Sequence, residues 1–251
     1  MNKYLLEVKK LSATYMDRRG SLHVLDSLSF NVKRGEFVCV LGPSGSGKST
    51  LLRILAGLLP IHAGAVKLNG KAVRGPQPGV SLVFQDPTLM PWRTVEENIA
   101  LPMEVGNTPT GAARVQTQAM IDLVGLSGFE SALPRDLSGG MAQRAALGRA
   151  LVQDPEILLM DEPFGSLDAI TRERMGDELL NIWEADHKTV LLVTHNINEA
   201  VYLADRVLVL SARPAQIKLD LPIRLTRPRR SALRYTPEFG KLAAKLRAAI
   251  E

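Results

Sequence analysis

The chain has 251 residues, enough for one large α/β domain or two small ones with a substantial buried core. Hydrophobic residues make up 45% and charged residues 23%, which is ordinary for a soluble globular protein, and no apolar run approaches the roughly 20 residues that a membrane-spanning helix needs. The single cysteine, Cys39, excludes an internal disulfide and a cysteine-based zinc site, and we expect it to be a small core residue. Because the N-terminus lacks a signal-peptide core, we expect a cytosolic protein unless a partner holds it elsewhere.

The net charge of +5 is concentrated near the C-terminus. Residues 213–245 hold nine Lys or Arg and two Asp or Glu, a local charge of +7, so the remainder of the chain carries −2. A basic tail can meet nucleic acid or anionic lipid headgroups, or it can be a solvated face that keeps the protein in solution. We favour the solvated face and expect no nucleic-acid partner.

The first third of the chain reads as strands around one helix. Tyr4 to Tyr15 and His23 to Val32 have strand character, separated by the turn residues Asp17-Arg18-Arg19-Gly20. Further strand patterns follow, and apolar residues at helical spacing come after the first of them. These further strands are expected at 37–41, 65–68 and 80–84, and the helix at 51–58.

The character changes between Asp86 and Asp154. Helical patterns dominate there, as in Arg114 to Val124, and no strand is convincing. Apolar runs of the kind found in buried parallel strands return afterwards, with helices fitting between them. The runs are 157–160, 190–193 and 207–210, and the helices are 169–185 and 197–204. This alternation predicts a mostly parallel sheet into which a helical subdomain is inserted.

A proline-containing segment starts at Leu221 and ends in an amphipathic helix. Thr236-Pro237-Glu238 is a helix start, with a capping threonine, a proline at the first helical position and an acid in the first turn. Phe239, Leu242, Leu246 and Ile250 then form an apolar stripe.

A phosphate loop lies between the 37–41 strand and the helix that follows it. Its backbone N–H groups and the helix N-terminus would hold phosphate, with Lys48 reaching the β- and γ-phosphates and the Ser49 hydroxyl binding Mg²⁺. The alternative is a Gly/Ser-rich turn with an incidental lysine. The loop consists of Gly42, Pro43, Ser44, Gly45, Ser46, Gly47, Lys48, Ser49 and Thr50.

Two carboxylates end the 157–160 strand. Asp161 is the candidate for Mg²⁺ binding, and Glu162 the candidate general base that deprotonates the attacking water. The alternative is a strand that merely ends in two acids, which is less favoured downstream of a phosphate loop.

The segment Leu137 to Arg144 is the most informative about which class of phosphate-loop protein this is. Ser138, Gly139 and Gly140 open a helix rich in small residues, so exposed N–H groups and the helix dipole form a second anion site. In isolation this segment would be only a helix cap with a turn.

With these motifs the chain resembles the ATP-binding cassette (ABC) ATPases over nearly its whole length. The motifs occur in the family's order: the phosphate loop, Gln85, residues 137–144, Asp161-Glu162, Ser166-Leu167-Asp168 and His195. The resemblance implies an α/β P-loop NTPase fold with a RecA-like parallel-sheet core, an N-terminal antiparallel β subdomain and an inserted helical subdomain. A single domain over residues 1–251 is then expected, with its core at 1–85 and 155–220, the helical signature subdomain at 86–154 and a basic C-terminal extension at 221–251.

The same resemblance implies roles for single residues. Gln85 would sense Mg²⁺ and water, Asp168 would lie in the loop that couples two subunits, and His195 would contact the γ-phosphate. Tyr15, 33 residues before Lys48, matches the aromatic residue that stacks on adenine. Taken alone, Tyr15 is more often a core residue and His195 a satisfied strand-end histidine.

The family also implies the assembly. ATP is sandwiched between the phosphate loop of one subunit and Ser138-Gly139-Gly140 of the other, so a chain with one copy of each motif implies a homodimer. Hydrolysis would loosen the dimer by removing the γ-phosphate that both halves bind.

Within the family the chain looks most like the ATPase subunits of bacterial importers for nitrate, sulfonates and taurine. The likeness rests on 84–92, 162–168 and 194–200. Two copies would then sit on the cytoplasmic face of the inner membrane, against a permease that receives a small anionic solute from an external binding protein. Residues Leu89 to Trp92 are either the contact for that permease or internal packing. An exporter or lipid-transporter subunit, or a non-transport ABC ATPase, remains the alternative.

Overall fold

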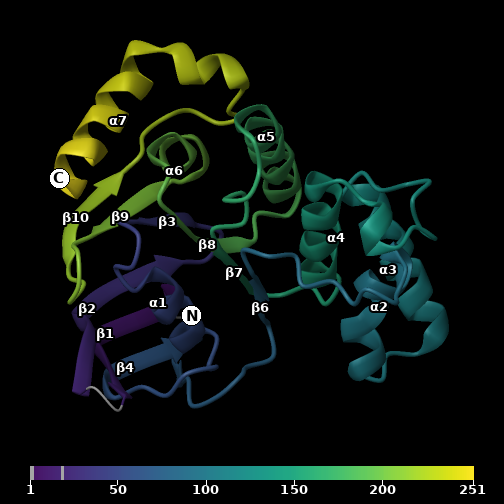
Figure 1. The fold of residues 1–251 in the computed structure, drawn as a ribbon, viewed down its shortest axis with the longest axis horizontal. Coiled ribbons are helices and arrows are strands. Elements are labelled where there is room, and N and C mark those ends of the chain that lie inside the picture. The colour runs from purple at the N-terminus through teal and green to yellow at the C-terminus, as the bar shows by residue number, and fades with distance from the viewer. Residues whose placement is uncertain (1–2, 18–19) are drawn as a thin grey trace. The chain divides into compact units, whose positions relative to one another are not determined.

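The computed structural model describes residues 3–17 and 20–251 and divides into two compact units. The first unit comprises residues 1–78 with 187–251, and the second comprises residues 79–186 (Figure 1). The turn predicted at Arg18-Arg19 lies outside the described residues.

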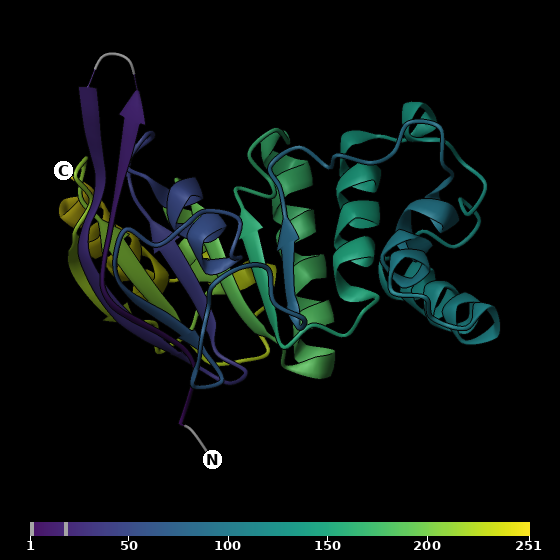
Figure 2. The same cartoon turned by 90° about the horizontal axis from the view of Figure 1, so that it is seen from below.

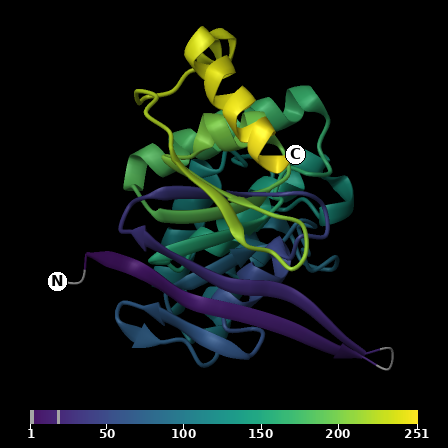
Figure 3. The same ribbon diagram turned by 90° about the vertical axis from the view of Figure 1, so that its left-hand side faces the viewer.

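The first unit contains an antiparallel sheet in the strand order β2-β1-β4-β5. The long strands β1 (Tyr4–Asp17) and β2 (Gly20–Lys33) pair along most of their length, as Figure 3 shows. β4 (Ala63–Leu68) and the short β5 (Lys71–Ala72) complete the sheet. These elements confirm the strands expected at 4–15, 23–32 and 65–68.

A second group of strands in the first unit is mostly parallel. β3 (Phe37–Leu41) pairs in parallel with β8 (Thr189–Thr194) on one side and β9 (Arg206–Leu210) on the other. The antiparallel β10 (Ile217–Pro222) follows β9. Every residue of β3 and β8 is buried, as expected for parallel strands covered on both faces, and Cys39 lies fully buried opposite Leu192 and Val207.

Helices cover these parallel strands within the first unit. α6 (Ile197–Leu203) and α7 (Pro237–Ile250) lie on one side, and α1 (Lys48–Leu55) and the antiparallel sheet lie on the other (Figures 1 and 3). The short 3₁₀ helix η2 (Ser231–Tyr235) precedes α7. As predicted, α7 begins at Pro237 with Thr236 as its cap, since the Thr236 hydroxyl accepts a hydrogen bond from the Phe239 amide at 3.3 Å.

The second unit combines one parallel strand pair with helices. β6 (Val80–Val83) and β7 (Ile157–Asp161) lie side by side (Figure 2). Between them the described chain contains no strand, as predicted. The helices of this unit are α2 (Val95–Val105), α3 (Thr110–Leu123), η1 (Pro134–Asp136), α4 (Gly139–Leu151) and α5 (Ala169–Asp186).

The helical part of the second unit has its own apolar core. Val95, Ile99 and Met103 of α2 pack with Ile121 of α3 and Ala145 of α4, and all five are nearly inaccessible to solvent. α2 contains Pro102 within its span. The helix tolerates this proline because burial of its apolar face outweighs the loss of one backbone donor.

Candidate functional site

The phosphate loop connects β3 to α1 in the first unit. Lys48, the first residue of α1, is only 4% exposed, and its ammonium group donates hydrogen bonds to the carbonyl oxygens of Gly42 and Pro43, each at 3.1 Å. The Ser46 amide donates to the Pro43 carbonyl at 3.2 Å, which closes the turn. The loop therefore folds around the lysine and holds its charge at the helix N-terminus, where the helix dipole also favours an anion.

Glycine is required at one position of this loop by both backbone conformation and space. Gly47 has φ of 102°, in the left-handed region. A Cβ atom there would lie 2.6 Å from Cγ1 of Val24 and 3.0 Å from Cδ2 of Leu25, both on β2. The loop is thus pressed directly against the antiparallel sheet, and that contact fixes its path.

Ser46 provides a test of whether a phosphate group fits this loop. Its side chain is 1% exposed, and its hydroxyl has no hydrogen-bond partner among the described residues. A buried hydroxyl without a partner costs free energy, and a phosphate oxygen is a strong acceptor for it. The loop therefore has the hydrogen-bond donors, the positive charge and the backbone shape that suit the phosphates of a nucleoside triphosphate.

Tyr15 lies near the loop but outside the core. Its ring is 39% exposed, so the interpretation of Tyr15 as a core residue is wrong. Its hydroxyl lies 3.3 Å from the Thr50 hydroxyl on α1, within hydrogen-bond distance. This contact holds an accessible aromatic ring beside the helix that follows the phosphate loop.

His195 lies at the junction of β8 and α6 and is exposed. Its neighbours on both sides are fixed: the Thr194 hydroxyl accepts a hydrogen bond from the Asn196 amide at 3.0 Å, and Asn196 caps α6 by accepting from the Glu199 amide at 3.2 Å. Thr194 and Glu199 are also hydrogen-bonded through their side chains. The imidazole is therefore carried by a well-defined strand-to-helix turn.

In the second unit the two candidate acids follow β7, all of whose residues are buried. Glu162 has φ of 44°, a left-handed conformation that costs roughly 1–2 kcal/mol for a residue with a Cβ. The Glu162 carbonyl accepts from the Gly165 amide at 3.0 Å, which closes the turn beyond it. Unusual backbone conformations of this kind cluster at functional sites.

Gln85 reaches the same turn. β6 and β7 are parallel and in register, with Val83 opposite Met160, so their carboxyl ends meet at one edge. The Nε2 atom of Gln85 lies 3.5 Å from where a Cβ atom on Gly165 would be. Within this unit the structure thus gathers Gln85, Asp161 and Glu162.

Ser138 begins α4 as its cap, and its hydroxyl accepts a hydrogen bond from the Met141 amide at 3.3 Å. Ser138 and Gly139 are exposed, whereas Gly140 is buried against α5, where a Cβ atom would meet Cγ2 of Thr171 at 3.3 Å. The helix therefore presents its first residues to solvent while its second glycine allows close packing on α5.

Asp168 performs the same capping role at the start of α5. Its carboxylate accepts from the amides of Ile170 and Thr171, at 3.1 and 3.0 Å. Hydrogen bonds from the Thr171 side chain and then from backbone amides hold the pKa of this carboxyl below its usual value. Asp168 thus remains an anion at neutral pH, in the segment that adjoins Gly140.

The candidate residues are divided between the two units. The first unit carries Tyr15, residues 42–50 and His195, and the second carries Gln85, Ser138, Gly139, Gly140, Asp161, Glu162 and Asp168.

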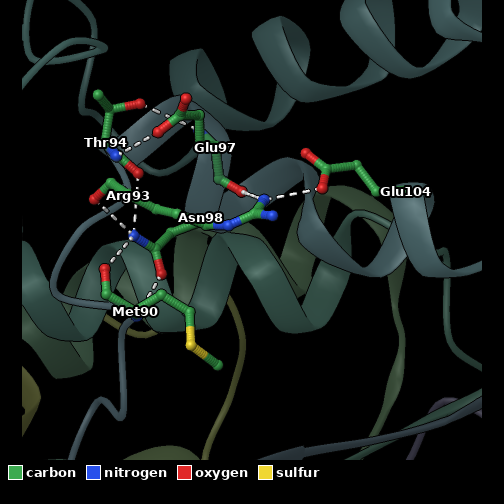
Figure 4. Close-up of polar contacts among 6 residues, drawn as sticks. All are labelled: Met90, Arg93, Thr94, Glu97, Asn98 and Glu104. Carbon is green, nitrogen blue, oxygen red and sulfur yellow. Dashed lines mark hydrogen bonds and ion pairs between the residues drawn. The ribbon is translucent and has the colours of Figure 1, made fainter.

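Two further residues hold loops of the second unit in place by hydrogen bonds, and neither belongs to the motifs identified in the sequence. One is Asn98, which is fully buried and ties down the loop before α2 (Figure 4). Its side chain accepts from the Met90 amide at 2.7 Å and donates to the carbonyls of Met90, Arg93 and Thr94, at 3.2, 3.0 and 2.9 Å. The other is Arg149 on α4, which donates to the carbonyls of Thr88 and Pro87.

Only part of residues 89–92 is packed internally in the loop that Asn98 holds. Leu89 packs against the helical core, whereas Trp92 projects with 73% of its surface exposed. Arg93 is fixed by an ion pair to Glu104 at 2.7 Å, which adds to the stiffness of the loop (Figure 4). The loop is internally anchored at one end and displays a large aromatic side chain at the other.

No helix among residues 3–17 and 20–251 has the length and apolar character needed to cross a bilayer. The family profile described as "ABC transporter" matches residues 25–165. An uncharacterised ABC transporter ATP-binding protein of Methanocaldococcus jannaschii is 49% identical over 90% of this chain and 85% of its own length. The aliphatic sulfonates import ATP-binding protein SsuB of Bacillus subtilis is 43% identical over 91% of this chain and 87% of its own length.

Solved structures agree in fold. A dimeric ATP-binding cassette in a post-hydrolysis state, bound to ADP and phosphate, is similar with a TM-score of 0.77 and 31% identity, over 88% of this chain and all of that chain. The CbiO1 protein of Clostridium perfringens, part of an ABC transporter complex, gives a TM-score of 0.81 over 99% of this chain and 98% of its own, with 24% identity. With a matched family profile, close relatives over most of its length and a cassette fold, the chain belongs to the ATP-binding subunits of ABC transporters and is an ATPase.

Proposed function

We propose that this chain is the ATP-hydrolysing subunit of an importer that energises uptake of a small anionic solute, of the nitrate, sulfonate or taurine type, through a partner permease. The observation that carries the importer assignment is the 43% identity to the sulfonate import protein of Bacillus subtilis over nearly the whole chain. The observation that supports the chemistry is the phosphate loop, with Lys48 folded into it and the Ser46 hydroxyl buried without a partner.

The residues of the phosphate loop bind the triphosphate in this proposal. The backbone N–H groups of the loop residues other than Pro43 and the Lys48 ammonium neutralise the β- and γ-phosphates, and Tyr15 stacks its exposed ring on adenine. Ser49, Asp161 and Gln85 would hold Mg²⁺, a hard cation that prefers oxygen ligands such as these side chains carry. When bound, the ion would withdraw charge from the phosphate oxygens.

Glu162 acts as general base in this proposal. It accepts a proton from the attacking water, and His195 orients and stabilises the γ-phosphate from its strand-to-helix turn. Both side chains lie at strand ends, in turns whose backbone is fixed by hydrogen bonds, so little reorganisation is needed at the moment of reaction.

We further propose that two copies act together. Ser138, Gly139 and Gly140 at the start of α4 would contact the γ-phosphate bound by the other copy, and Asp168 would lie at the seam between the copies. The exposure of Ser138 and Gly139 supports this assignment, because a residue used by a second copy must be accessible in one copy alone. The dimeric cassette with bound ADP and phosphate gives a precedent.

The remaining partners follow from the importer assignment. A permease would contact the loop that displays Trp92, and an external solute-binding protein would deliver the anion, with this chain held at the cytoplasmic face of the inner membrane. In the same proposal residues 1–85 and 155–220 form the nucleotide-binding core, residues 86–154 the signature subdomain and residues 221–251 the basic extension.

Reconstitution tests the proposal. The chain is co-purified with the permease encoded beside it and placed in vesicles, and ATP-dependent accumulation of labelled taurine, an alkanesulfonate and nitrate is measured with the Glu162→Gln variant as control. We expect uptake of at least one of these anions that needs both the binding protein and Glu162. ATP-driven movement in the opposite direction, or hydrolysis that the permease and the binding protein leave unchanged, would contradict the importer assignment.

A further inference from the structure

The basic C-terminal extension contributes an arginine to the interior of the first unit. Arg229 is only 6% exposed. Its Nη1 atom donates to the carbonyl oxygens of Tyr202 and Ala204, both at 2.8 Å, and to that of Val201 at 3.4 Å. These carbonyls belong to the last turn of α6 and the residue that ends it, where backbone acceptors lack helical partners.

The charge of Arg229 suits that position. Burial, and next the nearby Arg227, lower the pKa of Arg229 to about 10, so the guanidinium stays protonated at neutral pH. A cation at the carboxyl end of a helix interacts favourably with its dipole. The Asp205 carboxylate lies 4.0 Å away and partly balances the charge.

Neighbouring residues of the extension reinforce the same contact. Arg227 donates to the Leu203 carbonyl at 2.7 Å and pairs with Asp205 at the same distance. The guanidinium of Arg234 lies 3.5 Å from the centroid of the Tyr202 ring, and the Tyr202 hydroxyl donates to the Arg229 carbonyl at 3.4 Å. The carboxyl end of α6 is thus enclosed by the extension.

This enclosed end is also tied to the strand that leads to the phosphate loop. The Asp205 carboxylate accepts a hydrogen bond from the Phe37 amide, the first residue of β3, at 3.0 Å. The Asp205 amide in turn donates to the Phe37 carbonyl at 2.7 Å. One cluster therefore relates the end of α6 to the start of β3.

The other end of α6 carries His195. The helix has seven residues, about 10 Å at the usual rise per residue, and its cap Asn196 directly follows His195. A helix this short moves as a rigid rod, so a displacement of its carboxyl end is transmitted to its amino end. Its carboxyl end is fixed by Arg229, and its amino end is fixed by Thr194 and Asn196.

We propose that Arg229 is a positioning residue for ATP hydrolysis: by holding the carboxyl end of α6 beside the start of β3, it orients His195 at the other end of the helix. The proposal rests on the γ-phosphate role proposed for His195. It assigns the basic extension a part in turnover, beyond keeping the protein in solution.

The test compares Arg229→Met with Arg230→Met. Both remove one positive charge from adjacent positions, but Arg230 is exposed and none of the α6 contacts described above involves it. Steady-state ATPase kinetics, nucleotide affinity and amide hydrogen exchange of a peptide covering residues 194–199 are measured for each full-length variant. We expect Arg229→Met to lower kcat about tenfold, the scale of a small misplacement of a reacting group, with unchanged nucleotide affinity.

Exchange of the 194–199 amides should be faster in Arg229→Met and unchanged in Arg230→Met. If Arg229→Met does not fold, Arg229→Lys replaces it. A lysine keeps the charge but can reach only some of the three α6 carbonyls that Arg229 contacts. We then expect a kcat between those of the wild type and of His195→Ala. Equal kcat in the Arg229 and Arg230 variants would overturn the proposal, as would faster exchange confined to residues 223–251. His195→Ala is assayed in parallel, and normal turnover in that variant would instead refute the role proposed for His195.

Discussion

Arg149 is hydrogen-bonded to Thr88 through both of its terminal nitrogens: Nη1 donates to the Thr88 carbonyl at 2.9 Å and Nη2 donates to the Thr88 hydroxyl at 3.2 Å. Nη2 also donates to the Pro87 carbonyl at 2.8 Å. Arg149 lies on α4, the helix that begins at Ser138, and Thr88 follows Gln85 by three residues. The pair therefore ties the helix bearing the exposed Ser138-Gly139 to the segment bearing Gln85, within one unit.

Replacing Arg149 by Met should loosen this tie. The variant removes charge-assisted hydrogen bonds to two carbonyls, so the free energy of unfolding should fall by about 2 kcal/mol. Arg114→Met, at an exposed position on α3, should change it by less than about 0.5 kcal/mol. Chemical denaturation of both variants measures the difference, and equal stabilities would show that the Arg149 bonds contribute nothing net.

Glu162→Gln should retain ATP binding and slow hydrolysis by at least about 100-fold, the scale of a lost general base. Glutamine keeps the size and polarity of the side chain, so the turn at this left-handed position should persist. Single-turnover hydrolysis and nucleotide affinity are the measurements, with Glu173→Gln, an exposed α5 position, as the matched control. Near-normal hydrolysis in Glu162→Gln would remove this residue from the role.

Lys48→Ala should weaken ATP binding at least about tenfold and abolish turnover, because the loop loses the cation that faces the phosphates. The substitution also removes the hydrogen bonds that the ammonium group donates to the Gly42 and Pro43 carbonyls, so the loop loses an internal tie as well as its charge. Calorimetric titration with ATP measures the affinity. Lys71→Ala on exposed β5 removes the same charge and should bind normally; wild-type affinity in Lys48→Ala would contradict the assignment.

Asn98→Ala should destabilise the second unit by about 2–3 kcal/mol, because the Met90 amide and three carbonyls lose their buried partner. It should also free the side chain of Trp92. In a Trp183→Phe background, where Trp92 is the remaining tryptophan, its fluorescence anisotropy should fall. Asn181→Ala, an exposed position on α5, should alter neither quantity; unchanged Trp92 anisotropy in the Asn98 variant would show that the loop is held by other contacts.

Cys39 should resist thiol reagents in the folded protein. Burial raises the pKa of its thiol well above the usual value, so the reactive thiolate is scarce and no reagent reaches it. Since the unfolded thiol ionises near pH 8.5 and the folded one does not, this residue contributes stability below that pH and the contribution declines as the pH rises above it. Labelling kinetics at pH 8 with an aromatic disulfide test this: slow reaction is expected in buffer and one rapid equivalent in denaturant.

Most strands could be predicted from the sequence because their burial leaves a continuous apolar run, as in β3, β7 and β8. β10 was missed although Lys218 and Asp220 alternate with its apolar residues, the pattern of a strand with one exposed face, on which Asp220 pairs with Arg206 of β9. The helical character of residues 86–154 was predicted, but no separate helix was expected at the position of α2. The Thr94–Glu97 capping box, which is readable in the sequence, could have identified its start.

The functional motifs could be identified because their chemistry depends on local spacing, which a sequence displays directly. Asn98, Arg149 and Arg229 depend instead on backbone carbonyls that only the folded chain leaves without helical or strand partners. A sequence gives the charge or polarity of such a residue but not the acceptors it will meet. The net charge of +7 on residues 213–245 was therefore interpreted as a solvated face, whereas the structure shows that Arg229 within this segment is buried.

The contact between Gly47 and Val24 has a thermodynamic consequence. Since the loop takes its shape against β2, we expect the two regions to unfold together, so that a ligand that binds only the folded loop also protects the antiparallel sheet. Residues of the sheet therefore contribute to affinity through the shape of the loop, and we expect a bulkier side chain at position 24 to crowd Gly47 and raise the dissociation constant of that ligand. Since only the folded fraction binds, a substitution that partly unfolds the sheet should weaken the apparent affinity by the same fraction.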